Sequence, residues 1–578
     1  MPRVLFLYGS QACVPEDPLR AAKRLGCATV AFAAKPPCGP CEGLVDEFRA
    51  VDLGRREAVI AAADELRSGG GLDAVVAYDD QAAPVAAQVA AALGLPGNPV
   101  EAAESARDKV AMKRRFDASG VPCAPWKLAG DEDDAVAWAA AGGYPVVVKP
   151  VRGSASQGVS RADSEDELRG AYRRLRRLVV DQGLDTGGRP DAEQLVEGYL
   201  DGTEVSVELL LSAGEPNVLA VFDKPKPLTG PFFEETIYVA PGRLDPPQRG
   251  QVEDLAQCAV AALGLTTGAA HCEVRLTSSG PVVLEVGARL IGGACSRAFR
   301  WLVEDDLHAF LIRLALGERP PWPRSREGAA GAMMLPIPRQ GRLQAVRGLE
   351  AARRIPGIVN VLITAKPGDV ILEFPEQSCY IGFLTAAAAD PEAVEQALVE
   401  AAASLDVEVE PLACLRLGRE VEDHRDYTAP EGIQIRTLCG LPPAAVSEVV
   451  VPLIAASCYS ELPEDLARTK ARSCFDRLHQ RASAHAAASS WLVAENAGVG
   501  FLQANGATCA GGCLGVIPPR HGDGVGEALV RSLLSLAARS GGTRMEVEVD
   551  PRQPRAVGLF RRLGFRESAG ACEGCCGG

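Results

Sequence analysis

A short apolar strand that ends in a lysine and continues into a small-residue loop constrains this chain most. Residues 144–158 read YPVVVKPVRGSASQG. Three valines between two prolines predict a strand buried on both faces, and its terminal lysine needs a partner because an unpaired buried ammonium is costly. Glycine and serine in the loop let backbone N–H groups approach phosphate oxygens closely. Two interpretations stay open here: a phosphate-binding loop, or a buried strand followed by an ordinary turn.

Chain length limits the number of domains, and net charge limits the kinds of partner. A chain of 578 residues is longer than one hydrophobic core usually spans, so three to four domains are expected. The formal net charge of −15 argues against nucleic acid or an anionic membrane as the main partner. No apolar run is long enough to cross a bilayer, and the N-terminal residues resemble a first strand rather than a signal peptide. We therefore expect a cytoplasmic protein.

The 18 cysteines fit the same compartment. Most are scattered singly, as at Cys258, Cys272 and Cys379, and are expected to be small buried hydrophobic residues in a reducing cytosol. Cys38 and Cys41 have a redox-type spacing, but no flanking strand and helix accompany them, so we interpret them as part of a loop. The cysteine-rich tail is predicted to be a flexible end.

The first hundred residues alternate strand and helix. This order predicts a parallel sheet with helices on both faces. The predicted strands are Arg3–Tyr8, Ala28–Ala33 and Asp73–Tyr78, and the predicted helices are Pro18–Leu25, Ala58–Arg67, Pro84–Leu93 and Pro99–Ala118. Beyond Gly120 a new unit begins, with strands at Val121–Leu128, Pro145–Pro150, Gln194–Glu197 and Val205–Leu211 and a helix at Glu165–Arg177.

Two glutamates farther along predict a metal site. Glu273 and Glu285 lie on two strand-like runs, Ala270–Leu276 and Val282–Val286, joined by a hairpin turn. Adjacent strands can bring both carboxylates to one point, where they repel each other unless a cation such as Mg²⁺ (or Mn²⁺) joins them. A pair of surface carboxylates across a ladder is the alternative interpretation.

The order of these motifs resembles the ATP-grasp ligases over roughly the first 415 residues. The motifs are Asp79-Asp80, Leu95-Pro-Gly, Asp108-Lys109, Lys149 with its glycine loop, Glu197-Gly-Tyr-Leu-Asp-Gly-Thr-Glu204, His271-Cys-Glu273 and Glu285-Val-Gly-Ala-Arg289-Leu-Ile-Gly-Gly293. The carnosine synthase and L-amino acid ligase branch is the most similar, through Asp223-Lys-Pro-Lys226 and Phe232-Phe-Glu-Glu235. The resemblance implies a pre-ATP-grasp α/β domain at residues 1–105, an ATP-binding and catalytic domain at 106–330 and a C-terminal lobe at 331–415.

The resemblance also implies roles for individual residues. Lys109 and Lys149 would neutralise phosphate oxygens of ATP, Glu197 would lie near the adenine amino group, and Glu204 would bind the ribose hydroxyls. The full set expected to bind ATP is Lys109, Lys149, Gly153, Ser154, Ser156, Gln194, Val196, Glu197 and Glu204. Where the family often has an asparagine in the metal shell, this chain has Gly287.

Chemistry and substrate binding are expected to involve neighbouring positions. Arg289, Lys224 and His271 are the candidate catalytic residues, with Arg289 stabilising the transferring phosphoryl group. Gly292, Gly293 and Phe233 are the candidate substrate residues, for which core packing is the alternative at Phe233. The implied reaction has two steps: a carboxylate attacks the γ-phosphate of ATP to give an acyl phosphate, and an amine then displaces phosphate to form an amide.

The C-terminal part predicts a second domain. Residues 416–432 are charged and are expected to be a linker, residues 433–568 a domain and residues 569–578 the tail. A strand that ends in a glycine-rich loop at a helix N-terminus is an anion site, and this arrangement resembles the GNAT acyltransferases. The residues implied to bind acetyl-CoA are Val516, Ile517, His521, Gly522, Gly524, Val525 and Gly526. His521 replaces the family's usual Arg or Gln, and Phe560 replaces the tyrosine that often protonates the departing thiolate.

The sequence thus predicts an α/β and α+β multidomain enzyme, an ATP-grasp fold followed by a GNAT fold. We expect an amide ligase for amino acids fused to an acetyltransferase, with a homodimer as a further expectation. Two alternatives stay open: a ligase for a non-amino-acid carboxylate with a GNAT domain that only binds acyl-CoA, and a ligase that acts on a carrier peptide or on the chain's own tail.

Overall fold

The structure is a computed structural model that describes most of the chain. The described residues are 1–9, 16–36, 41–182, 184–292, 294–376, 380–410, 415–420, 435–437, 450, 489–494, 498–505, 508–516, 525–539, 544–549 and 554–567. They divide into two compact units, Met1–Ser164 with Leu184–Glu410, and Glu165–Gly183 with Pro411–Gly578. Every described helix is too short or too polar to traverse a bilayer.

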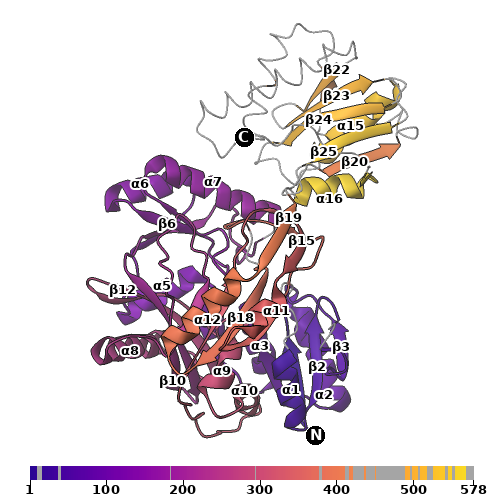
Figure 1. Cartoon of the computed structure of the whole chain (residues 1–578). Helices are drawn as coiled ribbons and strands as arrows, with labels where there is room; N and C mark the ends of the chain where they lie inside the picture. Colours follow the sequence, from indigo (N-terminus) through magenta and orange to yellow (C-terminus); the bar gives the residue numbers. More distant parts are fainter. Residues whose placement is uncertain are drawn as a thin grey trace. The chain divides into compact units, whose positions relative to one another are not determined.

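The N-terminal part of the first unit is a parallel sheet with the predicted alternation. Its strands run in the order β3-β2-β1-β4, so β4 is an edge strand. Figure 1 shows two of these strands, β2 and β3, side by side. The elements are β1 (Arg3–Leu7), α1 (Glu16–Arg24), β2 (Ala28–Ala33), β3 (Glu47–Ala50), α2 (Arg56–Gly70), β4 (Ala74–Ala77) and α3 (Ala82–Leu93). The strand β3 was not predicted, because its four residues, Glu-Phe-Arg-Ala, lie on a partly exposed sheet edge and include two charges.

The predicted helix over Pro99–Ala118 is wrong in one respect: it is two helices, α4 (Val100–Arg107) and α5 (Lys109–Ser119). Between them Asp108 has extended backbone angles, with φ −104° and ψ 105°, and its side chain accepts a hydrogen bond from the Ala111 N–H. An aspartate in this position satisfies one of the free N–H groups at a helix start. The break therefore places Lys109 at the first position of a new helix.

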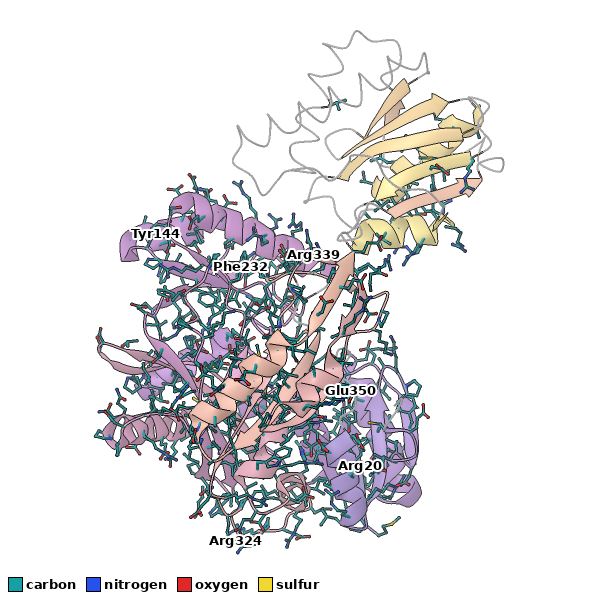
Figure 2. The ribbon with its side chains drawn as sticks, in the orientation of Figure 1. Arg20, Tyr144, Phe232, Arg324, Arg339 and Glu350 are labelled. Atoms are coloured by element: carbon teal, nitrogen blue, oxygen red, sulfur yellow. The ribbon has the colours of Figure 1, made fainter. Side chains whose placement is uncertain are left out.

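An antiparallel sheet of four strands carries the valine-rich strand. Its order is β5-β8-β6-β7, so β6 lies between β8 and β7. The elements are β5 (Trp126–Ala129), α6 (Glu132–Gly142), β6 (Val146–Lys149), β7 (Ser160–Ala162) and β8 (Gln194–Gly198). Phe232 forms a backbone bridge with Ser160, and Figure 2 shows it in the same part of the unit as Tyr144, which precedes β6.

A sheet of eight strands forms the centre of the first unit, in the order β13-β12-β9-β10-β11-β14-β18-β16. The strands are β9 (Thr203–Ser212), β10 (Glu215–Asp223), β11 (Ile237–Ala240), β12 (Gly268–Thr277), β13 (Gly280–Gly287), β14 (Ala329–Leu335), β16 (Ile358–Ile363) and β18 (Gly382–Ala388). The accompanying helices are α8 (Pro246–Leu263), η2 (Cys295–Ala298), α9 (Phe299–Leu302), α10 (Leu307–Ala315), α11 (Leu349–Arg354) and α12 (Pro391–Ala403), and a small sheet holds β15 (Gly341–Arg347), β17 (Val370–Ile371) and β19 (Asp406–Glu410).

Alternation along the strands separates an apolar face from a polar face. On β9, Val205, Val207 and Leu209 join the hydrophobic cluster that contains α8 residues such as Val252 and Val260. Successive side chains of a strand point to opposite faces, so Glu204, Ser206 and Glu208 point the other way. On β12 the same rule sends Ala270, Cys272 and Val274 into that cluster, and His271, Glu273 and Arg275 to the polar face.

The second unit contains α7 (Glu165–Gln182) and a seven-stranded sheet in the order β21-β22-β23-β24-β25-β20-β26. Its elements are β20 (Leu415–Glu420), β21 (Ile435–Thr437), β22 (Ser489–Ala494), β23 (Gly498–Asn505), β24 (Thr508–Val516), α15 (Val525–Arg539), β25 (Arg544–Val549), α16 (Pro554–Arg562) and β26 (Arg566–Glu567). Only the β24–β25 pairing is parallel among the described strand pairs of this sheet.

The linker predicted at 416–432 is corrected at its first residues. Leu415–Glu420 form β20, which pairs antiparallel with β25 and with β26. The charges that suggested a linker alternate with Leu415 and Leu417, which is a strand pattern. Residues 421–432 of the predicted linker and the predicted tail, 569–578, lie outside the described residues.

Candidate functional site

The two predicted metal ligands face each other across a hairpin. Glu273 of β12 and Glu285 of β13 are direct partners in the antiparallel register, which confirms the predicted hairpin. Both line a cavity of about 750 Å³ in the first unit. Of the predicted site residues, ten line it: Lys109, Lys149, Gly153, Ser154, Ser156, Glu197, Glu204, Phe233, Glu273 and Glu285.

The lysine that ends β6 has a buried partner on the neighbouring strand. Lys149 Nζ lies 2.7 Å from Glu197 Oε2, and Lys113 of α5 lies 3.1 Å from Glu197 Oε1. Burial alone would raise the pKa of Glu197, but the two ammonium groups, Lys113 first, hold this pKa below its usual value. The Glu197 carboxylate therefore fixes two lysines, and its proximity to adenine stays a prediction. Gln194 and Val196 are buried on β8 and do not line the cavity.

The glycine-serine loop is attached to the break between α4 and α5. The Gly153 carbonyl accepts hydrogen bonds from Arg107 and from Lys109 Nζ, each at 3.2 Å. Ala155 and Ser156 have positive φ angles of 51° and 54°, a conformation that costs energy in residues with a Cβ atom. Lys109 Nζ also lies 2.9 Å from Glu285 Oε2. This one lysine thus joins the loop to the carboxylate hairpin.

Lys224 lies within a cluster of three carboxylates. Its ammonium pairs with Glu204, Glu235 and Glu273, and it is only 7% exposed. Burial is the main cause that raises the pKa of Glu235 to about 7. The Lys224 ammonium opposes this shift, and the nearby Glu273 and Glu204 carboxylates add to it. Three carboxylates this close together remain compatible only because a cation lies among them.

This cluster changes what two predicted residues can do. The Glu204 carboxylate, expected at the ribose, is held by Lys224 and by Arg275, the latter at 3.0 Å. It lines the cavity, so the ribose role stays a prediction, and its side chain already has two cationic partners. Lys224 does not line the cavity. Its ammonium instead holds the three carboxylates together.

His271 belongs to a second buried chain of contacts. Its Nδ1 pairs with Glu208, and its Nε2 lies 3.3 Å from Glu273 Oε1. Burial alone would lower the pKa of His271, but Glu208 and then Glu273 raise it to about 10. Glu208, which is fully buried, also accepts a hydrogen bond from the Ile291 N–H at 2.9 Å. Glu208 thereby connects the carboxylate strand β12 to the segment that carries the substrate candidates.

Arg289 does not line the cavity that the glycine-serine loop lines. Its guanidinium pairs with Asp80 at 2.8 Å and donates to the Leu290 carbonyl, and it lines a second cavity instead of the first. Gly292 is described in a turn, while Gly293 lies outside the described residues. Phe233 lines the first cavity and stacks on Tyr199 with ring centroids 6.5 Å apart, and its contact with a substrate stays a prediction.

Sequence reasoning missed Lys113, Glu208 and Glu235 as site residues. A signal existed for two of them. Glu208 is a single charge within the apolar run Val205–Leu211, and Lys113 follows Lys109 by one helical turn. A charge in such a position needs a buried partner. Glu235 sits in the Phe-Phe-Glu-Glu motif, and nothing in the motif indicates which of the two glutamates points inward.

The described residues fit a nucleotide and a divalent cation. Oxygen ligands suit Mg²⁺, and Glu273 and Glu285 offer them at one edge of the cavity that the two lysines and the loop also line. Glu204, Glu235 and Glu273 also have oxygens within 4.8 Å of one another, but the Lys224 ammonium is already their shared cation. Glu273 and Glu285 are direct partners across the hairpin and both line the cavity, so this pair fits the cation, although Lys224 and Lys109 pair with them in turn.

The second unit shows part of the predicted acetyl-CoA site. Val516 ends β24, and Val525 and Gly526 begin α15, while Ile517, His521, Gly522 and Gly524 lie outside the described residues. Phe560 is buried and contacts Phe565 edge to face at 5.1 Å. This residue is thus part of the core of its unit.

The described cysteines agree in part with their predicted burial. Cys27, Cys41, Cys272 and Cys295 are buried, and Cys258 is exposed. Cys258 is therefore an exception to the expectation. It lies on α8, where every third or fourth residue faces the core and Cys258 does not. Cys38 and Cys379 lie outside the described residues.

Family comparisons match four parts of the chain. An ATP-grasp N-terminal domain matches residues 19–97, an ATP-grasp domain matches 142–298, L-amino acid ligase C-terminal domain 2 matches 333–410, and the acetyltransferase (GNAT) family matches 455–565. These matches correspond to the N-terminal sheet, the cavity region, the small sheet with its neighbours, and the second unit.

Individual curated proteins are similar to parts of this chain. An uncharacterized protein, y4rH, of Sinorhizobium fredii is 27% identical over 74% of this chain and 86% of its own length. Dapdiamide A synthase of Enterobacter agglomerans is 27% identical over 52% of this chain and 72% of its own. Alanine–anticapsin ligase of Bacillus subtilis is 30% identical, but the match covers 38% of this chain and only 49% of that enzyme.

Solved structures show the same fold. The L-amino acid ligase from Bacillus licheniformis aligns with a TM-score of 0.59 and 26% identity, over 71% of this chain and 99% of its own. Phosphoribosylglycinamide synthetase from Anaerococcus prevotii has a TM-score of 0.54 at 18% identity, over 71% of this chain and all of its own, which shows the fold alone. The chain therefore carries ATP-grasp domains with an L-amino acid ligase C-terminal domain and, in addition, a C-terminal acetyltransferase (GNAT) domain.

Proposed function

We propose that the first unit joins a carboxylate to an amine through an acyl phosphate, with release of ADP and phosphate. The observation that carries this proposal is the meeting of Lys109, Lys149, the glycine-serine loop and the Glu273–Glu285 pair in one cavity. Positive groups and backbone N–H groups suit a triphosphate, and paired carboxylates suit the cation that accompanies it. The names of alanine–anticapsin ligase and of the L-amino acid ligase from Bacillus licheniformis support amino acids as substrates.

Each group has a distinct task in this proposal. Lys109 and Lys149 would bind phosphate oxygens, and Glu273 and Glu285 would hold Mg²⁺, which neutralises charge during phosphoryl transfer. Lys224 keeps Glu273 ionised and in place beside Glu204 and Glu235. Arg289 would receive a carboxylate or the acyl phosphate. Exclusion of water from the closed cavity would protect the intermediate from hydrolysis.

The test is ADP and phosphate release from the full-length protein with Mg²⁺-ATP across pairs of amino acids. Release that requires two amino acids supports the ligase. Release with one amino acid and a different carboxylate would support a non-amino-acid substrate, and a gain in the mass of the intact chain would support self-modification. No release with any pair contradicts the amide ligase.

For the second unit we propose acetyl-CoA binding at the start of α15. Its support is the position of Val525 and Gly526, which begin a helix that follows β24 and its predicted glycine-rich loop. Acetyl transfer to an amine is the fuller proposal, whereas a buried Phe560 without a transferable proton favours binding alone. Acetyl-CoA binding with turnover of an amine supports the acetyltransferase, and binding with no turnover of any amine supports a sensor. A cytoplasmic location and a homodimer remain predictions.

A further inference from the structure

A second cavity of about 760 Å³ lies in the first unit, beside the edge strand β4. Helix α3 forms one wall, the beginning of β12 another, and α10 contributes Leu311 and Leu314. None of the candidate ATP, metal or acetyl-CoA residues lines it.

The apolar wall follows from the sequence of α3. Val85, Val89 and Leu93 face the hydrophobic core of the N-terminal sheet. Ala83, Ala86, Ala87 and Ala90 line the cavity, Ala86 while also packing against that core, and their spacing of three, one and three residues places them on one face of a helix. Because alanine carries a single methyl group, this face leaves open the volume that larger side chains would fill.

The guanidinium of Arg289 places a charge at this mainly apolar cavity. Arg289 is the only charged residue among the described residues that line it. The contacts of the guanidinium with Asp80 and with the Leu290 carbonyl involve two of its nitrogens, and a guanidinium has five N–H donors. Capacity therefore remains for an anionic group. Arg289 follows the metal candidate Glu285 by four residues, so the cavity begins near the predicted chemistry.

We propose that this second cavity binds the apolar side chain of an amino acid substrate whose carboxylate is held by Arg289. The inference rests on the proposed ligase function and specifies its substrate class. A charged side chain would be buried there without a partner, at a high cost in free energy. An aliphatic side chain of the size of leucine instead replaces water against alanine and leucine walls. The cavity thus favours aliphatic over charged amino acids.

Binding can be measured without turnover. Isothermal titration calorimetry of the full-length protein would use L-leucine, its deaminated analogue 4-methylpentanoate, L-aspartate and L-lysine, without ATP. Leucine and 4-methylpentanoate should bind, and the two charged amino acids should bind at least about tenfold more weakly, equivalent to ~1.4 kcal/mol. No binding of leucine at millimolar concentrations, or equal binding of aspartate, would overturn the proposal.

Two variants and a control localise the binding. Ala83→Leu fills the cavity from a position outside the core clusters and should weaken leucine binding at least tenfold. Ala92→Leu changes an exposed residue of the same helix and should leave binding within twofold. Leu311→Ala enlarges the cavity and should shift preference from leucine to phenylalanine, which keeps the test decisive if Ala83→Leu does not fold. Unchanged leucine binding in folded Ala83→Leu, or no shift in Leu311→Ala, refutes the assignment.

The two proposals fail separately. Leucine binding without ADP release in any mixture would reject the ligase and leave the cavity assignment standing. ADP release that shows no preference for aliphatic amino acids, together with a null titration, would reject the cavity assignment and leave the ligase standing.

Discussion

The two cavities of the first unit are built on opposite principles. The first is lined by charged groups that are paired with one another, such as Lys149 with Glu197 and Lys109 with Glu285. The second is lined mainly by small apolar residues and has a single charge, Arg289. A polar site can therefore be recognised in the sequence, because each buried charge requires a partner. An apolar site cannot be recognised in this way, because its residues equally suit a hydrophobic core.

The largest effect is expected when the ammonium group at the centre of the carboxylate cluster is removed. Lys224→Met leaves Glu204, Glu235 and Glu273 without their shared partner. Breaking a buried ion pair in this way typically costs about 3–5 kcal/mol, so we expect a loss of that order in the free energy of unfolding. Urea denaturation measures it. Lys226→Met, at an exposed position two residues away, is the control, and equal stability of the two variants would contradict the assigned role of Lys224.

A second test addresses the metal hairpin. Glu285→Ala should lower ADP formation at least about a hundredfold, equivalent to ~2.7 kcal/mol of barrier, because a cation ligand is lost. Leucine binding in the second cavity and acetyl-CoA binding should remain. Titration of each ligand with the variant checks this separation. Loss of acetyl-CoA binding together with ADP formation would show that the sites are not independent.

A third variant probes the buried connection between the two cavities. Glu208→Gln keeps an acceptor for the Ile291 N–H but removes the charge beside His271. We expect a loss of about 2 kcal/mol in the free energy of unfolding, since a buried charged hydrogen bond is replaced by a neutral one. Chemical denaturation gives the value, with Glu215→Gln on the exposed start of β10 as the control. A loss no larger than that of the control would remove Glu208 from the network.

The smallest effect is expected at Asp108, which begins the helix to which the glycine-serine loop is attached. Asp108 pairs with Arg189 at 2.6 Å, and although burial alone would raise the pKa of Asp108, Arg189 and the Ala111 N–H hold it below its usual value. Asn can retain the helix cap, so Asp108→Asn should cost about 1 kcal/mol at neutral pH.

The pH dependence of the Asp108→Asn effect has a definite sign, because the pKa of Asp108 is lowered in the folded protein. The ion pair stabilises the fold at pH values above the usual aspartate pKa, and this contribution disappears as the pH falls through the folded-state pKa. The difference in unfolding free energy between the wild type and Asp108→Asn should therefore shrink between pH 5 and pH 2. A difference that stays constant over this range would show that the charge of Asp108 is not responsible.

The same contrast explains what could be predicted from sequence. The β12–β13 hairpin, β6 and its loop, and ten cavity residues were predicted, because local patterns and motif order specify them. The break at Asp108 was missed, because a capping aspartate inside a helical pattern is recognised only by its backbone angles. The second cavity was missed as well, because its alanine face on α3 has the same spacing as a packed helix surface. The place of Arg289 also depends on tertiary contacts, since its partner Asp80 is 209 positions away.

The pairing of Lys109 with Glu285 has a thermodynamic consequence. These two side chains, 2.9 Å apart, neutralise each other, yet one is the candidate for phosphate and the other for the cation. A cation that engages Glu285 releases Lys109 for a triphosphate, and a triphosphate that engages Lys109 releases Glu285 for the cation. Each ligand thereby removes a cost that the other would otherwise meet, and by linkage both gain affinity by the same factor. The protein should therefore bind nucleotide and metal as a cooperative pair, with either one alone held weakly.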